Sequence, residues 1–254
     1  MRHPRFNRLR SLIWLLAATC GAAGCTAPPA DGADARQDES PVALATTLEV
    51  VPRVEAELGE QASAVRQQLA AARDEVSRRL AEISRDEGAV SDEGALSEAF
   101  GRLGMVLNAY QFLDAATVAY RNASVLSPTD TRWPYYLAFL YQLQGQLDEA
   151  TALYQRVLER EPKDANAHLR LADTLFEADE PAKARHHYEQ ALALHPELAA
   201  AHLGLGRVAA ATGRHREAIT HFERTLALQP GATEAHYPLA IALRQTGELQ
   251  RAEE

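Results

Sequence analysis

The amino-acid sequence predicts an all-α protein in which about four and a half helical hairpins stack into a solenoid behind one long N-terminal helix. The strongest evidence is a fixed spacing of 34 residues between Pro128, Pro162, Pro196 and Pro230, because a period of this length is typical of stacked helix-turn-helix units. The chain has 254 residues, of which 46% are hydrophobic, so its composition is that of a folding chain. Its net charge of -9 argues against a nucleic-acid partner, since binding to phosphates requires a basic surface.

Residues 1–24 have the layout of a secretory signal peptide. Four arginines precede an apolar run from Leu12 to Ala18, and this run is shorter than the roughly 20 apolar residues that a membrane-spanning helix needs. The stretch that ends in Gly24-Cys25 resembles the lipobox of bacterial lipoproteins. The resemblance implies cleavage before Cys25 and attachment of lipid to its sulfur. Ordinary signal cleavage after Ala23 and an uncleaved N-terminal anchor are the alternatives.

The segment 25–47 is expected to combine the lipidated cysteine with a flexible tether, because it is rich in Pro, Ala, Gly and Asp and has no helical or strand period. Thr26 follows the cysteine where an inner-membrane retention signal would place Asp. By resemblance to bacterial lipoproteins, we expect a periplasmic protein that is lipid-anchored to the outer membrane. Both cysteines lie within the first 25 residues, so the body of the chain has no disulfide framework and no cysteine-based zinc site.

Residues 48–94 predict an amphipathic helix followed by a break. Pro52 suits a helix start, and apolar residues then recur at steps of three and four, at Leu58, Ala62, Val65, Leu69, Ala72, Val76, Leu80 and Ile83. We favour packing of this stripe on the first repeat or its neighbour over a coiled-coil dimer, because about four heptads in which two of the contact positions are Ala are weak evidence for dimerisation. The Gly-rich acidic stretch 85–94 is the break.

Four further columns repeat with the closing prolines over residues 95–254. They hold Leu103, Leu137, Leu171 and Leu205; then Gly104, Ala138, Ala172 and Gly206; then Ala116, Ala150, Ala184 and Ala218; and then Tyr120, Tyr154, Tyr188 and Phe222. This pattern resembles the tetratricopeptide repeat (TPR) family. The resemblance implies a right-handed solenoid with units 97–130, 131–164, 165–198 and 199–232 and an incomplete unit 233–254.

Small residues are expected to let helix A and helix B of each unit approach closely, with the aromatic ring beside them and proline closing the unit. Gly145, Gly213 and Gly247 fall in the turn between the two helices, where positive φ is easiest for Gly. His168, His202 and His236 occupy a column that usually holds an aromatic residue. We interpret it as a packing column, because residues one repeat apart lie too far from each other to share one metal ion.

The sequence contains no catalytic constellation, nucleophile elbow or glycine-rich phosphate loop. We therefore expect no enzyme activity, no cofactor and no metal. The TPR resemblance implies instead that a protein or peptide partner binds along the concave face lined by the A helices. The positions that tend to face it are Met105, Asn108, Arg132, Tyr135, Phe139, Gln142, Asn166, Leu169, Asp173, Phe176, Leu203, Arg207, Tyr237, Ile241 and Arg244.

In this groove an aromatic patch around Tyr135 and Phe139 is expected beside Arg132 and Arg207, which could grip a carboxylate or a backbone oxygen. The full Lys/Asn clamp of chaperone-binding TPR domains is absent at the matching positions. An alternative is that these aromatic residues pack against the long N-terminal helix folded back into the groove.

The function predicted from the sequence is a membrane-tethered scaffold for a partner polypeptide, in envelope assembly or secretion. The alternative is the interaction module of a larger envelope enzyme, since the fifth unit stops partway through its helix B.

Overall fold

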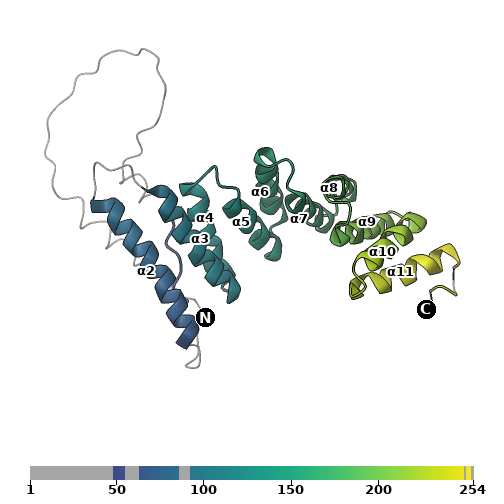
Figure 1. Ribbon diagram of the computed structural model, residues 1–254, viewed down its shortest axis with the longest axis horizontal. Coiled ribbons are helices and arrows are strands. Elements are labelled where there is room, and N and C mark those ends of the chain that lie inside the picture. Colours follow the sequence, from purple (N-terminus) through teal and green to yellow (C-terminus); the bar gives the residue numbers. More distant parts are fainter. Residues whose placement is uncertain (1–47, 55–62, 86–91, 249, 253–254) are drawn as a thin grey trace, which may run out of the picture. The chain divides into compact units, whose positions relative to one another are not determined.

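The computed structural model describes residues 48–54, 63–85, 92–248 and 250–252, and all regular structure in these ranges is helical (Figure 1). The predicted signal peptide, Cys25 and the tether lie outside the described residues. The helices are α2 (Ser63–Arg85), α3 (Glu93–Ala109), α4 (Leu113–Leu126), α5 (Arg132–Leu143), α6 (Leu147–Arg160), α7 (Ala165–Glu177), α8 (Pro181–Leu194), α9 (Ala199–Ala211), α10 (His215–Leu228) and α11 (Thr233–Thr246).

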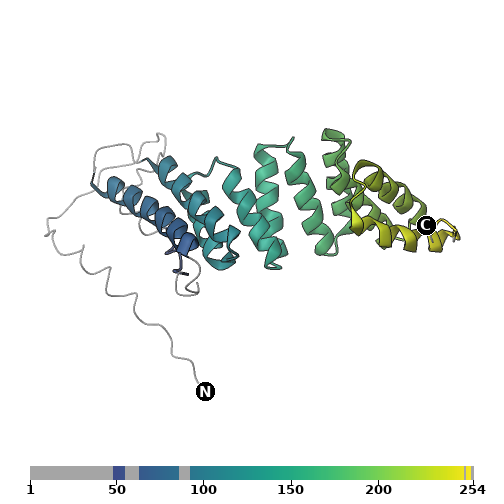
Figure 2. The same cartoon turned by 60° about the horizontal axis from the view of Figure 1, so that its bottom comes forward.

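Consecutive helices pack against one another along the described chain, so the stack follows the order of the sequence (Figure 2). The pairs α3/α4, α5/α6, α7/α8 and α9/α10 are the predicted hairpins, and α11 packs on α10. Every helix B ends two residues before its closing proline, as α6 does at Arg160 before Pro162. Proline cannot continue a helix, and its regular recurrence therefore sets the length of each unit. The predicted all-α solenoid fold is confirmed.

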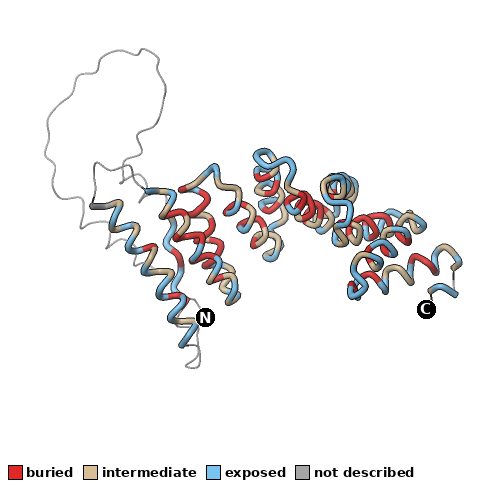
Figure 3. The backbone as a smooth tube through the Cα atoms, in the orientation of Figure 1, coloured by how far each residue is buried: buried red, intermediate tan, exposed pale blue. Residues whose placement is uncertain are grey.

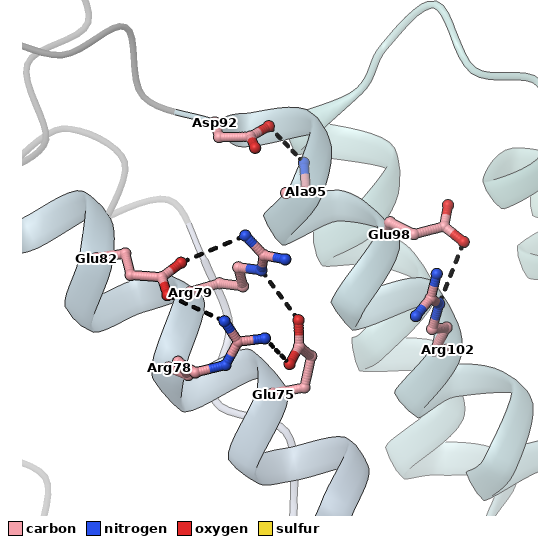
Figure 4. A network of polar contacts seen from close by, with 8 residues as sticks. All are labelled: Glu75, Arg78, Arg79, Glu82, Asp92, Ala95, Glu98 and Arg102. Atoms are coloured by element: carbon pink, nitrogen blue, oxygen red, sulfur yellow. Dashed lines mark hydrogen bonds and ion pairs between the residues drawn. The ribbon is translucent and has the colours of Figure 1, made fainter.

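Helix α2 packs against α3 through its predicted stripe, with Leu69 and Val76 buried while Leu80 is 37% exposed. This agrees with the packing interpretation. Beside this stripe, α2 carries ion pairs one turn apart (Figure 4), including Arg79 with Glu75 at 2.9 Å. Such exposed pairs add only about 0.3–0.5 kcal/mol each, so the buried stripe holds α2 in place.

The predicted helix start at Pro52 is not found, because residues 51–54 have no helical structure. Val51 and Val54 are nevertheless buried, so this segment packs as an extended chain. We call residues 48–54 the strap. The difference is tertiary in origin: Val51 and Val54 pack into the core of the first hairpin, whereas Val50 is exposed.

Every turn from helix A to helix B has the same backbone geometry. Residues 111, 145, 179, 213 and 247 all have positive φ, between 59° and 85°, and the next residue donates its N–H five residues back, as in Gln146 to the Tyr141 carbonyl at 2.8 Å. This is the Schellman termination of a helix. The predicted role of Gly145, Gly213 and Gly247 is confirmed, whereas Gln111 and Asp179 adopt this conformation without being glycine.

The small and aromatic columns meet inside each hairpin, where Figure 3 shows the buried side of the helices. A Cβ added to Gly104 would lie 2.7 Å from the ring of Tyr120, and one added to Gly206 would lie 2.5 Å from Phe222. These rings are 1% and 0% exposed. Each aromatic residue therefore fills the space that a small residue leaves, as predicted, and burial of such a ring contributes roughly 2–3 kcal/mol.

Within the described ranges, none of the helices combines the length and the apolar character that a bilayer-spanning segment requires.

Candidate partner-binding face

A cleft of about 480 Å³ opens between the A helices α5, α7 and α9, and we call it the A-face cleft. Its lining combines apolar side chains with both signs of charge. The cleft brings together five of the predicted groove residues and five others, namely Phe139, Gln142, Asp173, Leu203 and Arg207 with Leu143, Arg170, Glu177, Ala200 and Gly204. The A helices of three successive units therefore line one common cleft, as the sequence predicts.

Arginine side chains cover the aromatic rings of this face in a repeating arrangement. The guanidinium of Arg170 on α7 lies 5.2 Å from the ring centroid of Phe139 on α5. One unit later, the guanidinium of Arg207 on α9 lies 4.8 Å from the ring centroid of Phe176 on α7. A cation over an aromatic face is attracted by the ring quadrupole, so these contacts hold both arginines beside the cleft, and Arg170 in addition contacts Tyr135 and Asp173.

Asp173 supplies a hydrogen-bond acceptor at the centre of the A-face cleft. Its Oδ1 accepts a hydrogen bond of 2.7 Å from the Tyr188 hydroxyl, and its Oδ2 lies 3.9 Å from Arg170 Nη1. Burial raises the pKa of Asp173, although the Tyr188 hydrogen bond and the nearby Arg170 and Arg207 oppose the rise. The oxygen atoms of Asp173 can accept hydrogen bonds from N–H donors of an occupant.

A second, smaller cleft of about 270 Å³ lies at the N-terminal ends of α5 and α7 and contains the predicted residues Arg132, Tyr135 and Asn166. Tyr135 is half-buried, meets Tyr154 edge to face at 5.6 Å, and has its pKa raised by this burial. The hydroxyl of Tyr154 is buried without a hydrogen-bond partner among the described residues. The rings of this patch contact one another, and α2 packs against α3 instead of folding back over them.

Two of the predicted groove residues are placed differently from the expectation. Leu169 is only 9% exposed and belongs to the core between the hairpins, because its helix turns this position towards the neighbouring unit. Arg132 is held by Glu98 at 2.9 Å and by Asp130 at 2.7 Å, so its charge is already compensated within the chain. Of the two predicted gripping arginines, Arg207 alone lines the larger cleft.

The remaining predicted positions lie on α3, α7 and α11 and do not line either cleft. Their exposure ranges from half-buried to largely exposed, for Met105, Asn108, Phe176, Tyr237, Ile241 and Arg244. Arg170 is the functional candidate that sequence reasoning missed. One signal was available in the sequence. The column of the 34-residue unit that holds Arg170 also holds Arg102 and Tyr136, so large polar or aromatic side chains recur at this position of helix A.

The histidine column forms pairs. His168 Nδ1 lies 3.1 Å from His187 Nδ1, and His202 Nδ1 lies 3.2 Å from His221 Nδ1. In each pair the other nitrogen of the first histidine is 3.2 Å from a closing-proline carbonyl. The packing interpretation is confirmed for His168 and His202, whereas His236 is exposed. No cluster of three or more potential metal ligands occurs among the described residues.

Comparisons with known proteins agree on the fold. Two models of the tetratricopeptide repeat match, one over residues 130–197 and the other over 170–232 and 209–254. Similar solved structures include MamA (TM-score 0.58, 24% identity, 63% of this chain and 87% of that chain) and Pseudomonas aeruginosa PilF (TM-score 0.57, 21% identity, 63% and 73%). YrrB, described as a TPR protein with an unusual peptide-binding site, is similar with a TM-score of 0.53, 18% identity and coverage of 61% and 80%. No curated protein matches the chain.

Proposed function

Residues 130–254 of this chain are tetratricopeptide repeats, and on this premise we propose that the protein is a non-enzymatic scaffold that binds a partner polypeptide in the A-face cleft. The observation that carries the proposal is the juxtaposition of Phe139, Arg170 and Arg207 around Asp173 in a single cleft. Repeat proteins use such surfaces, assembled from successive units, to hold extended or helical segments.

The lining of the cleft defines the kind of segment that fits. Phe139 and Leu203 offer apolar contact, and aromatic and arginine side chains are enriched among residues that contribute most to binding. The arginines can donate to backbone carbonyls or to a carboxylate of the partner, while Asp173 can accept from its N–H groups. An extended segment with an apolar side chain can make all of these contacts at once, because its side chain reaches the apolar lining and its backbone groups reach the arginines and Asp173.

A peptide as the occupant has a precedent in YrrB, whose description names a peptide-binding site. The cleft also holds acids, since Gln142 donates to Glu177 at 3.0 Å across the α5/α7 boundary. The arginines and acids of the cleft balance each other, so we expect apolar contact and backbone hydrogen bonds to supply most of the affinity. Binding should then fall only modestly as the salt concentration rises.

We further propose that the scaffold is tethered to the outer membrane by lipid on Cys25 and acts in envelope assembly or secretion. The lipobox-like sequence before Cys25 supports this anchor, and stable anchoring needs more than one acyl chain. Mass spectrometry of the mature N-terminus tests it. A triacylated Cys25 is the expected result, and an unmodified N-terminus at Gly24 would rule the lipid out.

The partner-binding proposal is tested by capture from envelope extract with the mature chain as bait. The double variant Arg170→Glu and Arg207→Glu reverses the two arginines of the cleft, and we expect it to lose at least nine-tenths of the captured partner. Both side chains are partly exposed, so folding should be retained. Tyr135→Ala with Phe139→Ala is expected to lose the same partner.

The matched control for charge reversal is Arg160→Glu, because Arg160 is exposed at the end of the B helix α6, away from the cleft residues. This variant should capture the partner as the unmodified chain does. Full capture by the Arg170/Arg207 double variant would overturn the assignment of the cleft. Loss with the control as well would show a general charge effect and would equally contradict a specific site.

A further inference from the structure

The strap is held on the first hairpin in the way that a receptor holds an extended peptide. Asn122 on α4 pairs with both backbone groups of Glu49, because the Glu49 N–H donates to Asn122 Oδ1 at 2.9 Å and Asn122 Nδ2 donates to the Glu49 carbonyl at 2.7 Å. Asn122 itself is only 2% exposed. A buried amide that reads both backbone groups of one residue fixes an extended segment regardless of its side chains.

Other contacts fix the strap on either side of this pair. Arg73 on α2 donates to the carbonyls of Val51 and Pro52. The side chain of Glu49 is paired with Arg121 on α4, and Leu48 packs against the core beneath. The strap therefore crosses the hairpin from α2 towards α4 as it is followed back from Pro52 to Leu48.

An apolar cleft lies ahead of the strap in this direction. Arg121 also donates to the Tyr141 hydroxyl on α5 at 2.9 Å, and both residues line a cleft of about 470 Å³ between α4, α5 and α6, which we call the B-face cleft. Its other lining residues are mostly apolar, with Ser124, Val125, Pro128, Leu137, Glu149, Ala152, Leu153 and Arg156. Val125 is 45% exposed, so this side of the cleft offers apolar surface to an occupant.

The chain that precedes the strap matches this cleft in chemistry and in reach. Residues 41–47, outside the described part, read Pro-Val-Ala-Leu-Ala-Thr-Thr and carry no charge, whereas 31–39 hold five charged residues. Seven extended residues span roughly 23 Å, more than the roughly 8–10 Å between the axes of packed helices. The sequence changes from charged to apolar at the point where the chain comes within reach of the cleft.

We propose that residues 41–47 bind in the B-face cleft and continue the strap, with Val42 and Leu44 as the apolar contacts. The tether is then fastened to α4 and α6 of the first two hairpins, on the B-helix side, and the A-face cleft is left open for a partner. An anchor at the N-terminus would in this way hold the array in a defined orientation. The proposal does not depend on the identity of that partner.

Hydrogen exchange of the intact chain, read by mass spectrometry on peptides from residues 26–47, tests the proposal. We expect the amides of 42–47 to exchange at least tenfold more slowly than those of 30–40, since docking protects backbone groups from water. Val125→Asp places a charge in the cleft and should remove this protection. Leu44→Asp should do the same from the side of the tether.

Ala193→Asp is the matched control, because Ala193 occupies the position of Val125 two units later and is also exposed in the last turn of a B helix. This variant should leave the exchange of 42–47 unchanged. Unprotected amides in 42–47 of the unmodified chain would overturn the proposal, and so would protection that survives Val125→Asp. Protection that appears only when the chain dimerises at high concentration would assign the cleft to a second copy instead, and would also contradict it.

Discussion

The first two hairpins and the next two use the same 34-residue frame but fill it differently. Position three of the unit is Ala99, Ala167, Ala201 and Ala235 in four units, and each is buried. In the second unit it is Trp133, which is 2% exposed and fits only because Gly101 of the preceding unit has no side chain: a Cβ there would lie 2.1 Å from the indole ring. The large side chain of Trp133 and the missing side chain of Gly101 therefore compensate each other across the interface between the first two units.

A second difference concerns the column that pairs helix A with helix B. It holds Phe100 and Pro134 in the first two units, but histidine in the third and fourth, where each histidine meets another from helix B. In this column the first two units thus present apolar side chains, while the third and fourth units contain imidazole pairs. The comparison teaches that identical repeat lengths permit interfaces with different responses to mutation and to pH.

The largest expected effect concerns the indole ring. Trp133→Ala should lower the free energy of unfolding by about 3–5 kcal/mol, because it removes a buried aromatic ring and leaves a cavity. Denaturant unfolding followed by circular dichroism measures it. The indole N–H has no hydrogen-bond partner among the described residues, so the loss of stability should come from packing.

Gly101→Ala tests whether the indole ring needs the space beside Gly101. It should destabilise the chain when Trp133 is present and be neutral or stabilising in the Trp133→Ala background, a coupling that a double-mutant cycle detects. Additive effects of the two changes would show that the two residues do not fit together as described.

The next effect is a pH dependence confined to the histidine pairs. Burial, with His168 and His186 nearby, lowers the pKa of His187 to about 4, and burial also lowers those of His202 and His221. Unfolded histidines take up protons near pH 6.5. The stability from keeping His187, His202 and His221 uncharged is therefore complete above about pH 6.5 and should fall by about 1–3 kcal/mol as the pH drops towards 4.

His187→Leu with His221→Leu should flatten this dependence, since Leu153 fills the equivalent position in the second unit. The groups facing these histidines also include Arg185, Glu189 and Glu217, so the measurement is the difference between variant and unmodified chain at each pH. His236→Leu changes an exposed histidine of the same column and serves as the control. An unchanged pH profile in the double variant would contradict the role of the pairs.

The smallest effect concerns the turns, which are alike in both halves. Asp179 has φ of 59° in the position that Gly213 occupies with φ of 74°, and non-glycine residues are disfavoured there. Asp179→Gly should raise the free energy of unfolding by about 0.5–1 kcal/mol, and Gly213→Asp should lower it by a similar amount. Thermal unfolding compares the two, and destabilisation by Asp179→Gly would contradict the inference.

The sequence could predict most of the fold and part of the candidate site. Proline spacing and the small and aromatic columns depend on local rules, and their predictions for Gly145, Gly104 and Tyr120 are confirmed. The TPR resemblance predicted that Phe139 and Arg207 lie on the A-helix face, and both line the A-face cleft. The sequence did not show which of the neighbours Leu169 and Arg170 faces the cleft. The rotation of helix α7 decides that Leu169 packs in the core and Arg170 lines the cleft.

The sequence by itself determined the period, the turn positions and the residues that close each hairpin, since these follow from backbone conformation and from contacts inside one unit. Only the tertiary structure decided how the residues that depart from the repeat pattern are accommodated. Trp133 fills the space beside a glycine of another unit, His168 pairs with a histidine of another helix, and Asn122 binds the strap at Glu49. Contacts between segments far apart in sequence have no fixed spacing, and for that physical reason no periodic pattern predicts them.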